Sequence, residues 1–162
     1  MRCCSGLLRR LAPVVVLAST SAPAFGQNPL IESLTGRWSG WGSVTLAGGQ
    51  TESVKCVATY TVGAAAGVIE QVLRCASASY RVDATARLDL RGEAVAGSWS
   101  ERATSSTGAI SGRASPAGLH LEIKGEAFTA RAVLTATTCN HALAISPEGA
   151  AMARIAIKFE RC

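Results

Sequence analysis

Apolar and polar residues alternate one by one along most of the chain after Gln27, and no long stretch repeats apolar residues at helical spacing. Residues 79–90 show the alternation clearly, with tyrosine, valine, alanine and leucine between arginine, aspartate and threonine. Because successive side chains of a β-strand point to opposite faces, such alternation is typical of strands with one buried face. The pattern predicts about ten strands, over 36–47, 51–62, 67–75, 79–90, 93–101, 107–114, 118–124, 127–136, 140–146 and 152–160.

The apolar faces of these strands match when each strand is paired with the next as a hairpin. A slip of one residue would turn every side chain to the other face, so a continuous apolar face favours sequential antiparallel pairing. The tight turns are expected at Arg91-Gly92, near Pro116 and at Gly125-Glu126. The expected opposite residues are Leu88 and Val95, Ala84 and Trp99, Ile110 and Ile123, Ala114 and Leu119, Ile123 and Phe128, and Leu121 and Ala130.

Sequential strands with a single apolar face predict an all-β fold, a single antiparallel up-and-down (meander) barrel of about eight to ten strands. Closing the sheet buries the apolar face and removes exposed strand edges. A β-sandwich is the alternative fold. The other face carries charges such as Arg81 and Asp83, which should face water, whereas a transmembrane barrel needs an apolar outside. We therefore expect a protein that does not span a membrane.

The first 26 residues are typical of a secretory signal peptide. Arg2, Arg9 and Arg10 precede the apolar stretch 11–18, and small residues lead to a cleavage site after Gly26. This predicts a periplasmic or secreted protein with an N-terminal segment, 27–35, and a barrel domain, 36–162. Removing 1–26 leaves 13 basic and 11 acidic residues in place of 16 and 11. The remaining basic and acidic residues are interspersed along the chain, which argues against nucleic-acid binding. We also expect the protein to be a monomer.

Four cysteines follow the predicted signal peptide, and an even number in an exported chain indicates disulfides. A turn between Ala65 and Ala66 sets Cys56 opposite Cys75, within the reach of a disulfide. We predict the bridges Cys56–Cys75 and Cys139–Cys162, with the two other pairings left open.

The stretch LTGRWSGWG, residues 34–42, contains two tryptophans of opposite parity. Trp38 shares the apolar side with Val44 and is expected in the core at one end of the barrel. Trp41 shares the polar side with Ser43, where an aromatic ring stacks on a sugar, contacts a partner protein or covers the barrel rim.

The pair Gly36-x-Trp38 at the start of the first strand resembles the opening of lipocalin-type barrels. In that family the tryptophan closes the barrel base and a basic residue of the last strand packs over it, a role that Arg154, Lys158 or Arg161 would fill here. The chain is also similar overall to small exported bacterial barrels of unassigned function. Its expected architecture also resembles that of barrel-type periplasmic metalloprotease inhibitors, whose N-terminal segment enters the protease cleft, and residues 27–36 would occupy that position.

Motifs for catalysis and cofactor binding are absent from the sequence. It lacks G-x-S-x-G, a phosphate-binding loop, a dinucleotide fingerprint and C-x-x-C. His120 and Glu122 share a strand face, but two ligands make a weak metal site, and His141 is expected to be structural. We therefore expect no enzyme, no cofactor and no metal.

Small residues recur on the inward side of the predicted strands, at Ala58, Ala84, Ala86, Gly97, Gly112, Ala130 and Ala132. They allow either close packing or an apolar cavity. The sequence thus predicts a binding protein that holds a small apolar ligand, or alternatively a protein-binding module that acts through its N-terminal segment or barrel rim. The candidate ligand-binding residues are Trp38, Trp41, Tyr60, Tyr80, Trp99 and Phe128.

Overall fold

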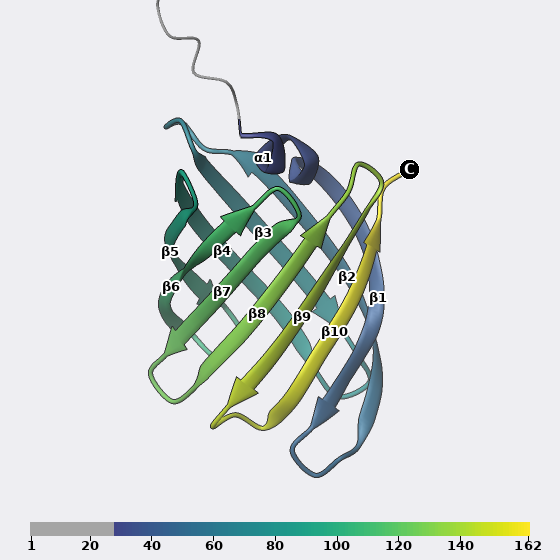
Figure 1. The fold of residues 1–162 in the computed structure, drawn as a ribbon. Helices are drawn as coiled ribbons and strands as arrows, with labels where there is room; N and C mark the ends of the chain where they lie inside the picture. The colour runs from purple at the N-terminus through teal and green to yellow at the C-terminus, as the bar shows by residue number, and fades with distance from the viewer. Residues whose placement is uncertain (1–27) are drawn as a thin grey trace, which may run out of the picture.

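The computed structural model describes residues 28–162, which form one closed barrel of ten antiparallel strands and a short helix (Figure 1). The predicted signal peptide lies outside these residues. The fold is therefore the predicted meander barrel and not a sandwich. Its elements are α1 (Pro29–Leu34), β1 (Gly36–Leu46), β2 (Thr51–Val62), β3 (Val68–Ala76), β4 (Arg81–Arg91), β5 (Ala94–Glu101), β6 (Ser106–Ser115), β7 (Gly118–Gly125), β8 (Thr129–Ala136), β9 (Asn140–Glu148) and β10 (Met152–Glu160).

Each strand pairs with its neighbours in sequence, and β10 returns to pair with β1. The backbone groups of both terminal strands are therefore paired, and the sheet has no free edge. In the described part of the chain no helix is long and apolar enough to cross a membrane.

Two of the predicted hairpin registers are correct and two are wrong by two residues. Ile110 pairs with Ile123 and Cys56 pairs with Cys75, as expected. Leu88, however, lies opposite Gly97 instead of Val95, and Ile123 lies opposite Ala130 instead of Phe128. The consequence for the other two predicted pairs is that Ala84 faces Glu101 and Leu121 faces Ala132.

Both errors arise because the turn lies one residue later than predicted. Arg91 pairs with Ala94, so the β4–β5 turn is Gly92-Glu93, where Gly92 adopts a positive φ of 61° that favours glycine. In the β7–β8 turn, Gly125 N–H donates to the carbonyl of Phe128. A shift of two residues keeps each side chain on its face, so the inward and outward sets remain as predicted.

Helix α1 closes one end of the barrel, next to the C-terminus (Figure 1). The Asn28 side chain caps it by accepting a hydrogen bond from Leu30 N–H at 3.0 Å. Its apolar residues Leu30, Ile31 and Leu34 are almost fully buried. These three side chains are consequently core residues, and the described part of the N-terminal segment packs against the barrel.

The half of the barrel next to α1 is filled with large side chains. Trp38 and Phe159 are the largest fully buried residues, with exposed fractions of 0% and 1%. Phe159 packs against the backbone of Gly40, where a Cβ would overlap its ring. The indole N–H of Trp38 donates to the Leu34 carbonyl at 2.7 Å, which ties β1 to the helix.

Both predicted disulfides are present. Cys56 and Cys75 lie directly opposite each other on β2 and β3, with Cα atoms 4.1 Å apart, on the inward face. Cys139 and Cys162 join the loop before β9 to the last residue, with Cα atoms 5.2 Å apart. Two bridges in a domain of this size are typical of oxidising compartments.

Candidate site in the open half of the barrel

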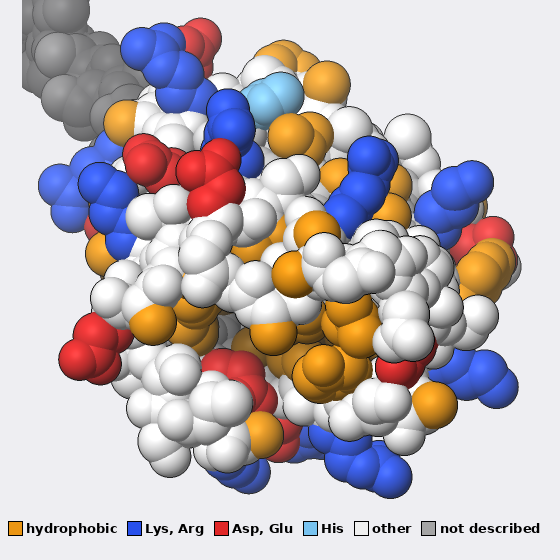
Figure 2. Space-filling model, turned by 90° about the horizontal axis from the view of Figure 1, so that it is seen from below, with side chains coloured by type: hydrophobic (Ala, Val, Ile, Leu, Met, Phe, Trp, Pro, Cys, Tyr) orange, Lys and Arg blue, Asp and Glu red, His pale blue; other side chains and the backbone are white. Residues whose placement is uncertain are grey.

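The end of the barrel opposite α1 is only partly filled: Val44 and Val54 are buried there, but other inward side chains are not. Inward-facing Leu88 and Leu119, near the helix, are buried, whereas inward-facing Leu73, Leu121 and Ile123, nearer the other end, are partly exposed. The hollow that Figure 2 shows at this end gives solvent access to inward side chains. The lumen is therefore a cup whose floor is the packed half and whose mouth faces away from α1.

Figure 2 looks at the mouth, and it shows hydrophobic side chains lining a hollow between the loops. The small residues predicted on the inward side differ in exposure. Ala84 and Ala86 are partly exposed, whereas Ala58, Ala130 and Ala132 are buried. The cup thus offers an apolar surface that the chain itself does not cover. The partly exposed apolar residues with inward side chains include Leu46, Leu73, Cys75, Val82, Ala84, Ala86, Trp99, Leu121, Ile123, Ile145, Met152 and Ile155.

A single polar side chain, Gln71, occupies an inward position at mid-depth in the described strands. It pairs across the sheet with Tyr60 and Ala86, and it is partly exposed. Its Nε2 donates to the Tyr60 hydroxyl at 2.9 Å, and burial raises the pKa of Tyr60 far above its ordinary value. The Gln71 amide is therefore held in a fixed position on the inward side of β3.

Two carboxylates occupy inward positions at the mouth, Glu52 at the start of β2 and Glu101 at the end of β5. Glu52 accepts hydrogen bonds from the Ser77 hydroxyl at 2.7 Å and the Ser79 backbone at 3.2 Å, and these bonds lower its pKa. It thereby holds the loop between β3 and β4 while remaining ionised.

Glu101 holds the next loop of the mouth. It accepts hydrogen bonds from the backbone N–H groups of Asp83, Ala103 and Thr104, and from the Thr104 hydroxyl. Burial alone would raise its pKa, but these hydrogen bonds lower the pKa from 4.5 to about 2. Glu101 is consequently ionised at neutral pH.

The six predicted ligand-binding residues do not form one cluster. Trp38 and Tyr60 lie buried in the closed half. Trp99 and Phe128 lie at the open half with ring centroids 5.5 Å apart, and the Trp99 indole N–H donates to the Lys124 carbonyl at 3.1 Å. Tyr80, expected on the inward face of a strand, instead belongs to a loop at the mouth and is 37% exposed. Trp41 is the sixth residue and lies outside the barrel.

Trp41 faces outward from the middle of β1 and is 50% exposed. Its direct neighbours across the sheet are Lys55 on β2 and Lys158 on β10. Trp41 thus has the predicted polar-face orientation, between two lysines, and it does not reach the lumen.

His141 fills the centre of the closed half, where the sequence indicated only a structural histidine. Its ring stacks on Phe159 with centroids 4.3 Å apart and meets Trp38 and Tyr60 edge-on at 4.6 Å and 5.5 Å. Neither ring nitrogen has a hydrogen-bond partner. Burial, followed by the positive charge of Arg161, lowers its pKa from 6.5 to about 4, so the ring is neutral at pH 7.

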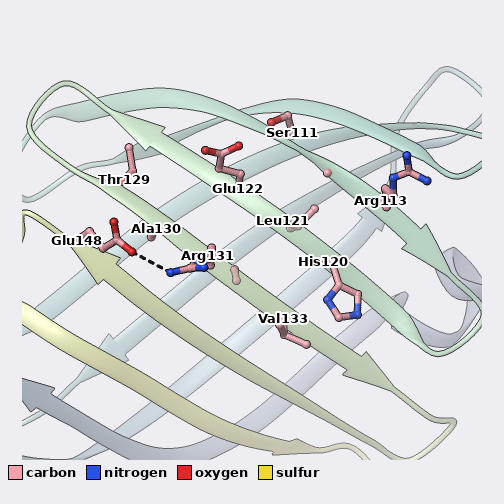
Figure 3. A pocket seen from close by; sticks show the side chains of 12 residues that line it. Ser111, Arg113, His120, Leu121, Glu122, Thr129, Ala130, Arg131, Val133 and Glu148 are labelled. Atoms are coloured by element: carbon pink, nitrogen blue, oxygen red, sulfur yellow. Dashed lines mark hydrogen bonds and ion pairs between the residues drawn. The ribbon is translucent and has the colours of Figure 1, made fainter.

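A groove also crosses the outer wall over β6 to β9 (Figure 3). The side chains around it, including Arg113, His120 and Glu122, extend from the outer face, and Arg131 forms an ion pair with Glu148 at 2.9 Å. Within residues 28–162, no three histidine, cysteine or acidic side chains form a group suited to a metal. His120 and Glu122 are therefore two exposed residues of a polar wall.

Sequence reasoning did not identify Gln71, Glu52 or Glu101 as residues of the lumen. The sequence does indicate that Gln71 and Glu101 face inward, since they continue the inward sets of Leu73 and Trp99. It does not indicate how deep in the barrel they lie, because depth depends on how far each strand is displaced along its neighbours.

Comparison with known proteins supports the fold. No family model matches the chain, and no curated protein sequence matches it. The solved structure of an S-type phycobiliprotein lyase CPES from Guillardia theta is similar, with a TM-score of 0.62 and 12% sequence identity, over 82% of this chain and 90% of that one. At this identity the similarity shows a shared barrel fold of the lipocalin-like kind.

The same comparison overturns one expectation from the sequence. We expected a protein that is not an enzyme because catalytic motifs are absent, but a barrel of this architecture is a lyase. The absence of such motifs therefore does not exclude an enzyme with this fold, and the expectation is wrong as a general inference. What the comparison does establish is the architecture: the chain has a lipocalin-like barrel fold.

Proposed function

We propose that the open half of the lumen binds a small, largely apolar molecule, in the periplasm or outside the cell. The observation that carries the proposal is the partly exposed apolar lining within an otherwise closed barrel. Concave, mostly apolar sites with a few placed polar groups are the usual form of small-molecule sites. Gln71 supplies the polar group on the floor, and the alanines of β4 supply the space.

The comparison supports binding as the shared step. A carrier and a lyase both begin by holding a small molecule, and the proposal is confined to that step. The two disulfides support the location because such bridges persist in oxidising compartments.

Filling the lumen tests the proposal. Ala86→Phe places a large ring between Gln71 and Trp99, the residues opposite Ala86 on the neighbouring strands. We expect it to weaken binding of the neutral fluorescent probe N-phenyl-1-naphthylamine by more than about tenfold, because the ring occupies the binding volume.

Thr85→Phe is the matched control, because Thr85 precedes Ala86 on the same strand and faces outward. It should bind the probe as the unaltered protein does. Wild-type affinity in a folded Ala86→Phe variant, or no probe binding by the unaltered protein, would overturn the proposal.

A second candidate function is contact with a partner protein through the outer wall at Trp41. Its support is the half-exposed ring between Lys55 and Lys158, which favours an acidic partner. The described N-terminal segment does not support a partner site, because its apolar side chains are buried. Native mass spectrometry of protein purified from its source separates the two candidates. A retained small molecule supports the lumen site, whereas a protein partner that Trp41→Ala releases supports the outer wall.

A further inference from the structure

The lumen has a marked asymmetry of charge. No lysine or arginine occupies an inward position of β1 to β10, because every basic residue of these strands has outward parity. The inward ionisable residues near the mouth are Glu52 and Glu101. A molecule that enters the cup therefore passes two carboxylates and meets no basic side chain on the wall.

Both carboxylates are held in the ionised form by hydrogen bonds from the chain itself. The hydrogen bonds from Ser77, Ser79 and the loop after β5 stabilise the ionised forms, and for Glu101 they hold the pKa near 2. Neither carboxylate forms an ion pair within residues 28–162. Their negative charge is therefore not neutralised by a neighbouring side chain.

Basic residues do lie near the mouth, but on its outer side. Arg102 forms an ion pair with Asp83 at 3.6 Å, and Arg74 pairs with the same carboxylate at 3.4 Å. Acidic side chains are visible beside the hydrophobic hollow in Figure 2.

We propose that the lumen selects amphiphiles whose polar head is cationic or uncharged, and that it discriminates against carboxylate-headed molecules such as fatty acids. The inference rests on the proposed function, because it assigns a ligand class to the same site. The apolar body occupies the cup, and the head remains at the mouth beside Glu52 and Glu101. An anionic head at this position is repelled by both carboxylates and finds no basic partner on the wall.

The test compares three ligands with the same ten-carbon chain, below their micelle-forming concentrations. Decyltrimethylammonium, decanol and decanoate are titrated against bound N-phenyl-1-naphthylamine at pH 7.5 and low ionic strength. We expect decyltrimethylammonium to displace the probe at least as well as decanol does. The affinity for decanoate should be about tenfold lower than the affinity for decanol. Raising the salt concentration should reduce the difference in affinity between decanol and decanoate, because salt screens the charge of the carboxylates.

Glu52→Gln combined with Glu101→Gln removes both mouth charges with little change of shape. This double variant should bind decanoate and decanol with affinities within about threefold of each other. Glu93→Gln combined with Glu122→Gln is the control, because it makes the same change of net charge on the exposed surface. It should retain the full preference for decanol over decanoate. The salt series on the unaltered protein needs no variant, so it tests the inference even if the substituted loops lose order.

The outcomes separate the two proposals. If the probe does not bind at all, the proposed function fails. If the probe binds but decanoate displaces it as well as decanol does, the charge selection is wrong and the apolar site stands. A preference that survives high salt, or that the surface variant also loses, overturns the assignment to Glu52 and Glu101.

Discussion

The guanidinium of Arg161 lies over the Trp38 ring, with its carbon 4.4 Å from the ring centroid. Arg161 also donates to the carbonyls of Thr35 and Thr138, at 2.6 Å and 2.7 Å. The side chain thus joins the start of β1, the β8–β9 loop and the chain end across the closed base. Of the three basic residues considered from the lipocalin resemblance, Arg161 is the one that packs over the tryptophan.

Replacing Arg161 should loosen this end without unfolding the barrel. We expect Arg161→Ala to lower the free energy of unfolding by about 1–2 kcal/mol, from the lost cation–π contact and hydrogen bonds. Thermal denaturation measures the loss as a fall in Tm of about 3–8 °C. Arg154→Ala, at an exposed position of β10, is the control and should shift Tm by less than about 2 °C. Equal shifts for both variants would contradict the structural role of Arg161.

The two tryptophans of β1 should differ sharply in their effect on stability. Trp38→Ala removes a fully buried ring and should cost about 3–5 kcal/mol. Trp41→Ala removes a half-exposed ring and should leave Tm within about 2 °C of the unaltered protein. Chemical and thermal denaturation of both variants give the free energy and the Tm for the comparison. A drop of several degrees for Trp41→Ala would show that this ring is structural and would remove the basis for a partner site.

The buried histidine predicts a dependence of stability on pH. In the unfolded chain His141 binds a proton below its ordinary pKa of 6.5, whereas in the folded protein its pKa is about 4. The free energy of unfolding should therefore fall as pH decreases from about 6.5 towards 4, by at most about 1.4 kcal/mol per pH unit. Above pH 7 this contribution is fully present and constant.

His141→Phe serves as the reference because it keeps an aromatic ring and cannot take up a proton. The difference in unfolding free energy between the two proteins should change between pH 7 and pH 5, a range above the pKa of Glu101. A constant difference across that range would mean that His141 is not the group responsible.

The two disulfides should differ in their rate of reduction. Cys56 is 4% exposed and faces the interior, whereas Cys162 is exposed at the chain end. Because exchange requires a thiolate to reach the sulfur, Cys139–Cys162 should be reduced about tenfold or more faster in the native protein. Timed alkylation followed by mass spectrometry identifies the order. Reduction of Cys56–Cys75 first would show that the mouth admits the reductant to the inner wall.

Each bridge should also contribute to stability in its own right. The sequence separations are 19 and 23 residues, so the chain-entropy model gives about 3 kcal/mol for either one. Paired alanine variants, Cys56→Ala with Cys75→Ala and Cys139→Ala with Cys162→Ala, measure this by denaturant unfolding. The first pair should cost more because it also leaves a cavity at a buried site. Equal or reversed losses would argue against tight packing around Cys56.

The sequence by itself determined the strands, their inward and outward faces, and the pairing of Cys56 with Cys75. These features follow from a period of two residues, which only a pleated strand presents as one apolar face. It placed Trp38 inside and Trp41 outside by the same parity. It misplaced two turns by one residue, because a choice between neighbouring glycine-containing turns depends on local backbone geometry that composition does not fix.

Only the tertiary structure decided which half of the barrel is packed and which is open. Closure brings His141 of β9 against Trp38, Tyr60 and Phe159 of other strands, and helix α1 covers that end. Parity states which side a residue faces, but its depth depends on strand tilt and on the displacement between neighbours around the whole ring. The lumen, with Gln71 on its floor and two carboxylates at its mouth, is a product of that geometry.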